Sequence, residues 1–374
     1  MFRMQVLTNG DKVVGVDSNI DPLPGTKIID GQGMYLAPGF IDIHVHGGGG
    51  FSVMSGLDAV IGMANAHAAF GTTSLLPTTL AAPIPQLIST IQDVRAAKGK
   101  SNANILGVHL EGPFLAQSQR GAQSEDSLLA PTKELVESLL DVWDGILMMG
   151  AAPEIDGGFE LGQTLAKRGI VASVAHSDAT YDEIIRAIEC GYSDVTHIYS
   201  GCSGMIRKNG YRIPGVIEAG LLRDELTVQM IADLKHLPVP LIQLIYKNKG
   251  PGKISMITDG LEFSASNIKE GNTYVQKNGV TTIFEDGVMK LENREGFAGS
   301  VATMRDLVYN VVKEAGVPLI DAVRMATLTP ASVVGVSHHK GIIAPGYDAD
   351  IILFDDSINI QMCMVGGKIL STRL

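Results

Sequence analysis

Short apolar segments recur through the middle of the chain, and helix-like stretches separate most of them. Alternating or continuous apolar residues predict strands at 40–46, 74–78, 105–110, 146–150, 171–175, 194–197, 227–231 and 254–258. Helical periodicity is found between them, for example at 131–143 and 181–190. Repetition of a strand followed by a helix over about 250 residues predicts an α/β fold of the (β/α)8 TIM-like barrel type.

The two ends of the chain show a different pattern of short strands and turns. Asn9-Gly10 and Asp30-Gly31 are typical of tight turns near the amino terminus, and short apolar strands also follow residue 341. Neither end is long enough for a stable β-domain. We therefore expect residues 1–37 and 341–374 to combine into a small β-sandwich, and residues 38–340 to form the barrel domain.

Composition and charge exclude several classes of protein. The chain has 374 residues, with 29 basic and 40 acidic side chains and a net charge of −11, which disfavours binding to nucleic acid or to an anionic membrane. No run of about 18 apolar residues predicts a membrane span. The three cysteines, Cys190, Cys202 and Cys363, are far apart, so we expect neither disulfides nor a thiolate metal site, and a cytoplasmic location.

Ionisable residues of the kinds that bind metals stand at the ends of five predicted strands. His44 and His46 are two apart on one strand and therefore project from the same face. Each member of the set, taken alone, fits a structural residue as well as a ligand. The coincidence at the carboxyl ends of barrel strands, where barrel enzymes place their active sites, predicts a metal site made by His44, His46, Glu111, His176, His197 and Asp259.

The types of ligand in this set indicate the metal and the chemistry. Imidazole nitrogen and carboxylate oxygen suit Zn²⁺ or Fe²⁺. A divalent ion lowers the pKa of its bound water to about 7 and polarises a carbonyl group. A neighbouring aspartate can transfer the proton of that water to a leaving nitrogen. These functions together match the hydrolysis of an unactivated amide.

With these residues placed, the chain resembles the amidohydrolase superfamily, and within it the family of N-acetylglucosamine-6-phosphate deacetylases. The resemblance extends over nearly the whole length. Its most specific motif is the run from His109 to Phe114, and others are the runs 38–47, 71–74, 152–154, 175–180, 195–197, 258–260, 299–304 and 345–350.

The resemblance implies a role for each residue of the site. Glu111, His176 and His197 would bind the principal metal ion, and Asp259 would be the general acid and base. The pair His44 and His46 would complete a second position, so that one or two ions bind per subunit.

The resemblance also implies how the substrate is held. His236 would contact the acetyl carbonyl or the phosphate of a small phosphorylated N-acetyl amino sugar. Arg212 would reach the sugar phosphate in a neighbouring subunit of a homodimer, with Arg207 and Lys208 nearby adding positive charge.

Three departures from the family pattern fall in the expected substrate pocket. Ser200, Gly201 and Cys202 replace an Asn-Ala-Met sequence, and Gln123 replaces a histidine that faces the sugar. Residues 232–236 also differ from the usual Asp-Gly-x-His. We count Ser200, Gly201 and Gln123 as substrate-binding residues, and none of the departures touches the metal ligands.

The expected reaction is the deacetylation of N-acetylglucosamine 6-phosphate to glucosamine 6-phosphate and acetate. A related hydrolase of N-acylated amino sugars, for example of N-acetylgalactosamine 6-phosphate, is the alternative within enzymes. A non-catalytic scaffold with the same fold is a further alternative. Such scaffolds lose ligands or the catalytic aspartate, whereas all six residues are retained here.

Overall fold

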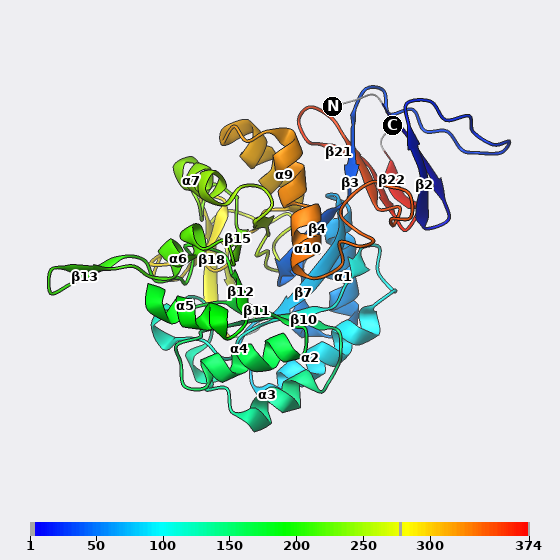
Figure 1. Cartoon of the computed structure of the whole chain (residues 1–374). Coiled ribbons are helices and arrows are strands. Elements are labelled where there is room, and N and C mark those ends of the chain that lie inside the picture. Colours follow the sequence, from blue (N-terminus) through cyan, green and yellow to red (C-terminus); the bar gives the residue numbers. More distant parts are fainter. Residues whose placement is uncertain (1–3, 277–278, 373–374) are drawn as a thin grey trace.

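Parallel strands arranged as a barrel occupy the centre of the computed structural model, which describes residues 4–276 and 279–372 (Figure 1). The strands follow one another around the barrel in the order β16-β15-β12-β11-β10-β9-β7-β4. Their bounds are β4 (Phe40–Val45), β7 (Thr72–Thr79), β9 (Val108–Glu111), β10 (Ile146–Ala151), β11 (Val171–Val174), β12 (Tyr192–Val195), β15 (Thr227–Met230) and β16 (Ile254–Met256). Each strand overlaps a segment predicted from the sequence, so the barrel prediction is confirmed.

The barrel closes between its first and last strands just beyond β16. The Asp259 amide donates to the His44 carbonyl at 3.0 Å, and the His46 amide donates to the Gly260 carbonyl at 2.8 Å. Asp42 accepts a hydrogen bond of 2.5 Å from the Thr258 hydroxyl. These bonds bring the end of β4 beside the end of β16, although the two strand ends are more than two hundred positions apart in the chain.

Helices cover the outside of the barrel, and some of them begin at recognisable capping residues. Thr180 and Glu183 form a capping box at α5, and the Thr132 side chain accepts from the Leu135 amide at α3. The α-helices are α1 (Leu57–Ala68), α2 (Ile84–Ala97), α3 (Lys133–Leu140), α4 (Gly158–Lys167), α5 (Tyr181–Glu189), α6 (Val216–Leu222), α7 (Val239–Lys249), α8 (Met304–Tyr309), α9 (Leu319–Met325) and α10 (Leu328–Val333). Their apolar faces pack on the strands in one large buried cluster.

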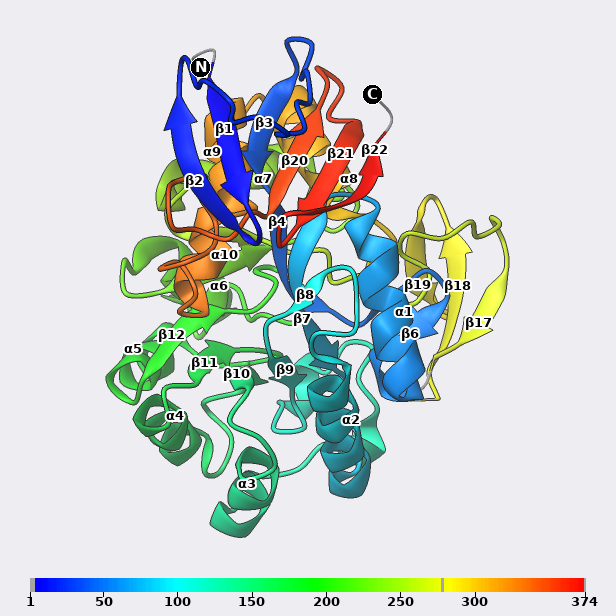
Figure 2. The ribbon, with the colours of Figure 1, turned by 90° about the vertical axis from the view of Figure 1, so that its right-hand side faces the viewer.

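Two excursions interrupt the repeat of strand and helix. The hairpin of β13 (Ile206–Lys208) and β14 (Tyr211–Ile213) projects as an arm away from the barrel (Figure 1). A three-stranded antiparallel sheet of β17 (Thr273–Val275), β18 (Thr281–Glu285) and β19 (Val288–Leu291) follows β16 along the chain (Figure 2). We call this sheet the lid; the sequence pattern did not predict it.

Short elements complete the barrel region. They are the strands β5 (Gly47–Gly48), β6 (Phe51–Ser52) and β8 (Asn104–Ile105), the 3-10 turns at Val53–Ser55, Gln117–Gln119 and Glu125–Ser127, and a π-helical turn at Asn310–Glu314. The turn at Gln117–Gln119 belongs to the segment that follows β9.

The two ends of the chain form antiparallel sheets beside the barrel (Figure 2). A hairpin of β1 (Gln5–Asn9) and β2 (Lys12–Asp17) packs against a sheet ordered β22-β21-β20-β3, made by β3 (Tyr35–Pro38), β20 (Ile351–Phe354), β21 (Ile360–Val365) and β22 (Lys368–Thr372). Val13 meets Ile351, Leu353 and Met362 in a buried cluster between them. The sandwich made from both ends is therefore confirmed, while the domain limits at 38 and 340 stay a prediction.

Within the described residues, no helix has both the length and the apolar character needed to span a membrane. All three cysteines carry free thiols. The absence of disulfides agrees with the expectation from their spacing.

Candidate metal centre and active site

The ionisable side chains predicted from the strand ends meet around one point. The Glu111 Oε1 atom lies 2.8 Å from His197 Nε2 and 3.1 Å from His176 Nε2. His46 Nε2 lies 3.1 Å from Asp259 Oδ1 and 3.4 Å from Glu111 Oε2. His44 Nε2 is 3.2 Å from His46 Nε2. The members of the cluster are His44, His46, Glu111, His176, His197 and Asp259, and all six are buried.

Glu111 belongs to both halves of this cluster. Its carboxylate forms one possible ligand group with His44 and His46, and another with His176 and His197; within each group the ligand atoms lie within 4.8 Å of one another. Three nitrogen or oxygen donors with room for a further ligand match the pattern of catalytic zinc sites. Each group thus has the chemistry to hold a divalent ion, with Glu111 between them.

All four imidazoles direct Nε2 toward the centre and hold Nδ1 in a hydrogen bond outside it. Nδ1 bonds to the Thr78 carbonyl at 3.0 Å in His46, to the Gln119 carbonyl at 2.8 Å in His176 and to the Ser200 carbonyl at 3.0 Å in His197. A carbonyl only accepts, so the neutral rings carry their proton on Nδ1 and present a lone pair at Nε2. These are the tautomers that a metal ion requires.

Backbone geometry at the strand ends is unusual at three of these positions. His176, His197 and Asp259 have φ values of 46°, 25° and 48°, in a region that costs residues with a Cβ about 1–3 kcal/mol. The turns after β11, β12 and β16 therefore hold these side chains inward at a conformational cost. Such strain concentrates at functional sites.

Burial and mutual charge set the protonation of the cluster. Burial lowers the pKa of His44 to about 4 and also lowers that of His197, but the hydrogen bond and charge of Glu111 raise the His197 pKa to about 9. Burial raises the pKa of Asp259, yet the His46 hydrogen bond and nearby imidazoles lower it to about 2. The same imidazoles hold the Glu111 pKa well below its usual range. Both carboxylates are thus charged and suited to a cation.

Gln123, expected to contact substrate, contacts Glu111, so the expectation that no departure from the family pattern touches a predicted metal ligand is wrong. The Gln123 side-chain nitrogen donates to Glu111 Oε2 at 2.6 Å, and its oxygen accepts from the Ala81 amide at 2.8 Å. The amide is therefore engaged at both ends and braces a carboxylate of the cluster. Its contact with a sugar stays a prediction.

Ser200 and Gly201 lie against two histidines of the cluster, His197 and His176. His197 Nδ1 donates to the Ser200 carbonyl. A Cβ built on Gly201 would lie 2.7 Å from His176 Nδ1 and 3.1 Å from the Gln119 carbonyl. Gly201 also has a φ of 54°. Glycine is therefore required for this close approach, and the role of the loop in substrate binding stays a prediction.

The other two predicted substrate residues lie on different elements. His236 bonds through Nδ1 to Asp233 Oδ2 at 2.7 Å, and its ring packs edge-on to Phe297 at 5.0 Å. Arg212 is exposed on the projecting β13–β14 arm, where its Nη1 donates to the Gly210 carbonyl. The cluster of this chain thus does not include Arg212.

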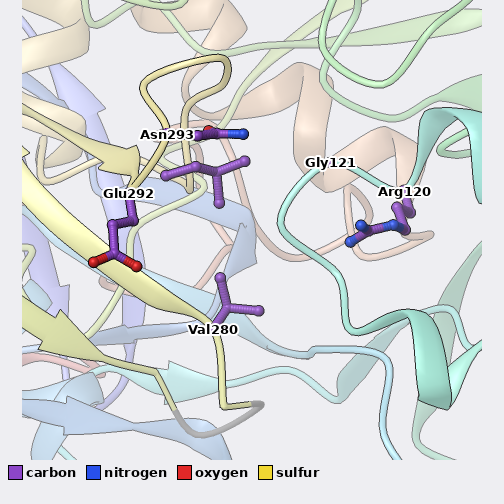
Figure 3. Close-up of a pocket in the computed structure, with 6 residues that line it drawn as sticks. Arg120, Gly121, Val280, Glu292 and Asn293 are labelled. Atoms are coloured by element: carbon purple, nitrogen blue, oxygen red, sulfur yellow. The ribbon is translucent and has the colours of Figure 1, made fainter.

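A pocket of about 450 Å³ lies between the segment after β9 and the lid. Its walls are Arg120 and Gly121 on one side and Val280, Leu291, Glu292 and Asn293 on the other (Figure 3). A Cβ on Gly121 would lie 3.5 Å from the His176 ring, so one wall of the pocket borders the cluster. The pocket has the volume for a small ligand.

Sequence reasoning missed several partners of the cluster. Gln229 on β15 binds His44, and the carbonyl groups of Thr78 and Gln119 bind His46 and His176. Asp42, on the same strand as His44 and His46, bonds to the His44 amide and to Thr258, and it contacts neither ring in these bonds. A polar residue within an apolar strand, as Gln229 is, was the available signal for one of them.

Comparisons with known proteins agree with this geometry. Residues 35–370 match the amidohydrolase family. N-acetylglucosamine-6-phosphate deacetylase from Vibrio furnissii is 30% identical, covering 99% of this chain and 94% of the relative. N-acetylgalactosamine-6-phosphate deacetylase from Escherichia coli O157:H7 is 28% identical over 96% of this chain and 93% of the relative.

A solved structure extends the likeness to three dimensions. The crystal structure of N-acetylglucosamine-6-phosphate deacetylase from Pasteurella multocida superposes with a TM-score of 0.93 at 29% identity, covering 100% of this chain and 96% of that chain. Match to the family over most of the length, together with the barrel and its ligand cluster, leads to one conclusion. The chain belongs to the amidohydrolase family.

Proposed function

We propose that this hydrolase removes the acetyl group of N-acetylglucosamine 6-phosphate, giving glucosamine 6-phosphate and acetate. The observation that carries the proposal is the convergence of four imidazoles and two carboxylates on one buried centre. Relatives that carry this name align over nearly all of the chain. The substrate therefore comes from the relatives, and the hydrolytic chemistry from the cluster.

The metal would be Zn²⁺ or Fe²⁺, with one or two ions per subunit. His176, His197 and Glu111 would hold the first, and His44, His46 and Glu111 the second. A divalent ion there supplies a Lewis acid for the acyl carbonyl and lowers the pKa of water toward neutrality.

Asp259 is the proposed general acid and base. Its carboxylate is ionised at neutral pH because the neighbouring imidazoles lower its pKa to about 2. It can therefore accept a proton from the attacking water at Oδ1 or Oδ2. The protonated carboxyl then donates that proton to the leaving amine, which makes the C–N cleavage possible.

Substrate binding would involve His236 in this chain and Arg212 from a second copy. Asp233 holds His236 Nδ1, so Nε2 is the atom left for the ligand. Arg212 lies on the arm that also exposes the apolar side chains Met205, Ile206 and Tyr211, as a surface that packs on another subunit does.

Intersubunit complementation tests the dimer arrangement. A mixture of the Asp259→Asn and Arg212→Ala variants, refolded or coexpressed to form mixed dimers, contains one site with both wild-type residues. We expect each variant alone to be impaired. Each mixed dimer should recover up to about half of the activity of a wild-type dimer, because one of its two sites is intact. A mixture no more active than its components would overturn the exchange of Arg212.

Hydrolysis of N-acetylgalactosamine 6-phosphate is the second candidate. A deacetylase of that sugar is about as similar to the chain as those of the glucosamine epimer. The altered loop at Ser200 and Gly201, and the engagement of Gln123 by Glu111, both fall where a sugar would bind.

Acetate release by metal-replete protein decides between the epimers. The proposal predicts a higher kcat/KM for the glucosamine epimer than for the galactosamine epimer, and a lower value for N-acetylglucosamine without phosphate. A preference for the galactosamine epimer would select the second candidate. Absence of acetate from all three would overturn both.

Location in the cytoplasm is part of the same proposal. The thiols of Cys202 and Cys363 are free and buried, as is usual for cysteines of proteins in a reducing compartment. Fractionation of the source cells, with the protein in the cytoplasmic fraction, is the expected result.

A further inference from the structure

A chain of buried polar groups continues from His44 into the barrel. His44 Nδ1 lies 2.9 Å from the Gln229 side-chain oxygen, and the Gln229 side-chain nitrogen lies 2.8 Å from Asp194 Oδ2. All three residues have no exposed surface. The chain therefore connects a strand-end histidine of the cluster to an aspartate on β12, outside the group of ligands.

His44 differs from the other three imidazoles in the partner of its Nδ1. Backbone carbonyls fix the proton of the other rings, and a carbonyl has only one possible role. The partner of His44 is an amide side chain, which can present either oxygen or NH2. Its orientation must therefore be decided by something else.

Asp194 determines the orientation of the Gln229 amide. A carboxylate accepts only, so the Gln229 NH2 must face Asp194 and its oxygen must face His44. The reverse orientation would set two oxygens against each other at 2.8 Å. With an acceptor at Nδ1, neutral His44 carries its proton there and leaves Nε2 free for a metal ion.

Two hydroxyl groups hold Asp194 in the acceptor role. Thr227 Oγ1 donates to Oδ1 at 2.6 Å and Ser173 Oγ donates to Oδ2 at 2.7 Å. Burial raises the pKa of the Asp194 carboxyl, and these hydrogen bonds together with that of Gln229 oppose the shift. Because Ser173 donates to Asp194, its contact of 2.6 Å with Thr196 must be donated by Thr196, the neighbour of His197.

We propose that Gln229 and Asp194 are positioning residues that fix the Nδ1–H tautomer of His44 and so prepare its Nε2 as a metal ligand. The proposal rests on the metal site of the proposed function. Without the Gln229 oxygen, the ring proton is favoured on Nε2, where Glu111 and Asp259 oxygens lie at 3.5 Å. A metal ion would then have to displace that proton.

The direct test is the tautomer of His44 in metal-free protein. Long-range ¹H–¹⁵N spectra of protein labelled in histidine distinguish a protonated from an unprotonated ring nitrogen, and the signals of His44 are identified by their loss in a His44→Asn variant. We expect Nδ1–H in the wild type and a shift toward Nε2–H in Gln229→Leu, which has neither donor nor acceptor. The same tautomer in both proteins would overturn the proposal.

A matched pair of variants separates positioning from packing. In Gln229→Glu one oxygen still accepts from His44, while the protonated oxygen donates to Asp194, so we expect the wild-type tautomer. Asp194→Asn likewise keeps an oxygen toward Gln229. Asp194→Ala removes it and leaves the Gln229 amide free to turn, so we expect a mixture of the two His44 tautomers. Equal spectra for the Leu and Glu variants at Gln229 would contradict the role assigned to the hydrogen bonds.

Zinc affinity is the second readout. Competition with a chromophoric chelator should show about 10- to 100-fold weaker binding in Gln229→Leu than in Gln229→Glu, as for other groups that orient a metal ligand. Gln276→Leu, at a buried glutamine of the lid, is the control and should bind zinc as the wild type does. Neither readout uses a sugar, so absence of deacetylation would leave this result standing, and equal zinc affinities would overturn only the positioning role.

Discussion

Replacement of Gly201 by alanine tests whether the close approach of this loop sets the position of His176. Two effects combine at this residue. Its φ of 54° costs an alanine about 1–2 kcal/mol. In addition, the new Cβ would lie 2.7 Å from His176 Nδ1, about 0.7 Å inside ordinary van der Waals contact.

The size of that clash can be compared with what a metal site tolerates. Ligand distances in metal sites vary by about 0.2 Å around their usual values. A displacement of the ring or loop by several tenths of an ångström exceeds this range and also strains the bond from His176 Nδ1 to the Gln119 carbonyl. We therefore expect Gly201→Ala to lose at least about 1–2 kcal/mol of unfolding free energy and to bind zinc at least tenfold more weakly.

The control variant is Gly366→Ala. Gly366 has a φ of 52°, close to that of Gly201, but a Cβ there would have no neighbour within 4 Å. Urea unfolding of the metal-free proteins should show a loss of about 1–2 kcal/mol in Gly366→Ala and at least that loss in Gly201→Ala, whereas a zinc competition titration should show weaker binding only in Gly201→Ala. Wild-type zinc affinity in Gly201→Ala would refute the reasoning, because the ring would then tolerate the added carbon.

Four further predictions concern the cluster itself. Asp259→Asn should retain its metal, measured by emission spectrometry, and lose about 10²- to 10⁴-fold in the rate of acetate release; activity within tenfold of wild type would exclude proton transfer by Asp259. His176→Ala should lose metal content, because it removes a ligand, and an unchanged content would exclude that role. Apparent zinc affinity should rise by up to tenfold per pH unit from 7 to 9 and then level off, since zinc displaces a proton from His197, whose pKa is about 9; a flat profile would contradict this. In metal-free protein the raised pKa of His197 stabilises the fold below about pH 6.5, and urea unfolding should show this contribution disappearing as the pH rises through 9.

Much of the barrel and its ligands could be predicted from local pattern. A buried parallel strand reads as an apolar run, and its carboxyl end is marked where a polar residue follows, as His176 follows Val171–Val174. Since the carboxyl ends of all barrel strands share one face, the ends of β9, β11 and β12 had to meet. Convergence of Glu111, His176 and His197 follows from that rule without knowledge of any distance.

The remaining features depend on contacts that no local pattern encodes. The lid has short, partly exposed strands, and its core joins Leu261 and Met289 to Ala298 through packing across an insertion. The bond from Gln123 to Glu111 depends on how the segment after β9 folds back over the strand end. Gln229 stood out only as a polar residue in an apolar strand, and its partners belong to other strands.

The most direct test of the account is an anomalous difference map from a zinc-loaded crystal, recorded at the zinc absorption edge. The account predicts a peak within bonding distance of Glu111, His176 Nε2 and His197 Nε2, with a second peak beside His44 and His46 if two ions bind. Absence of any peak among these side chains, in protein loaded with zinc and correctly folded, would contradict the claim that they form a metal centre.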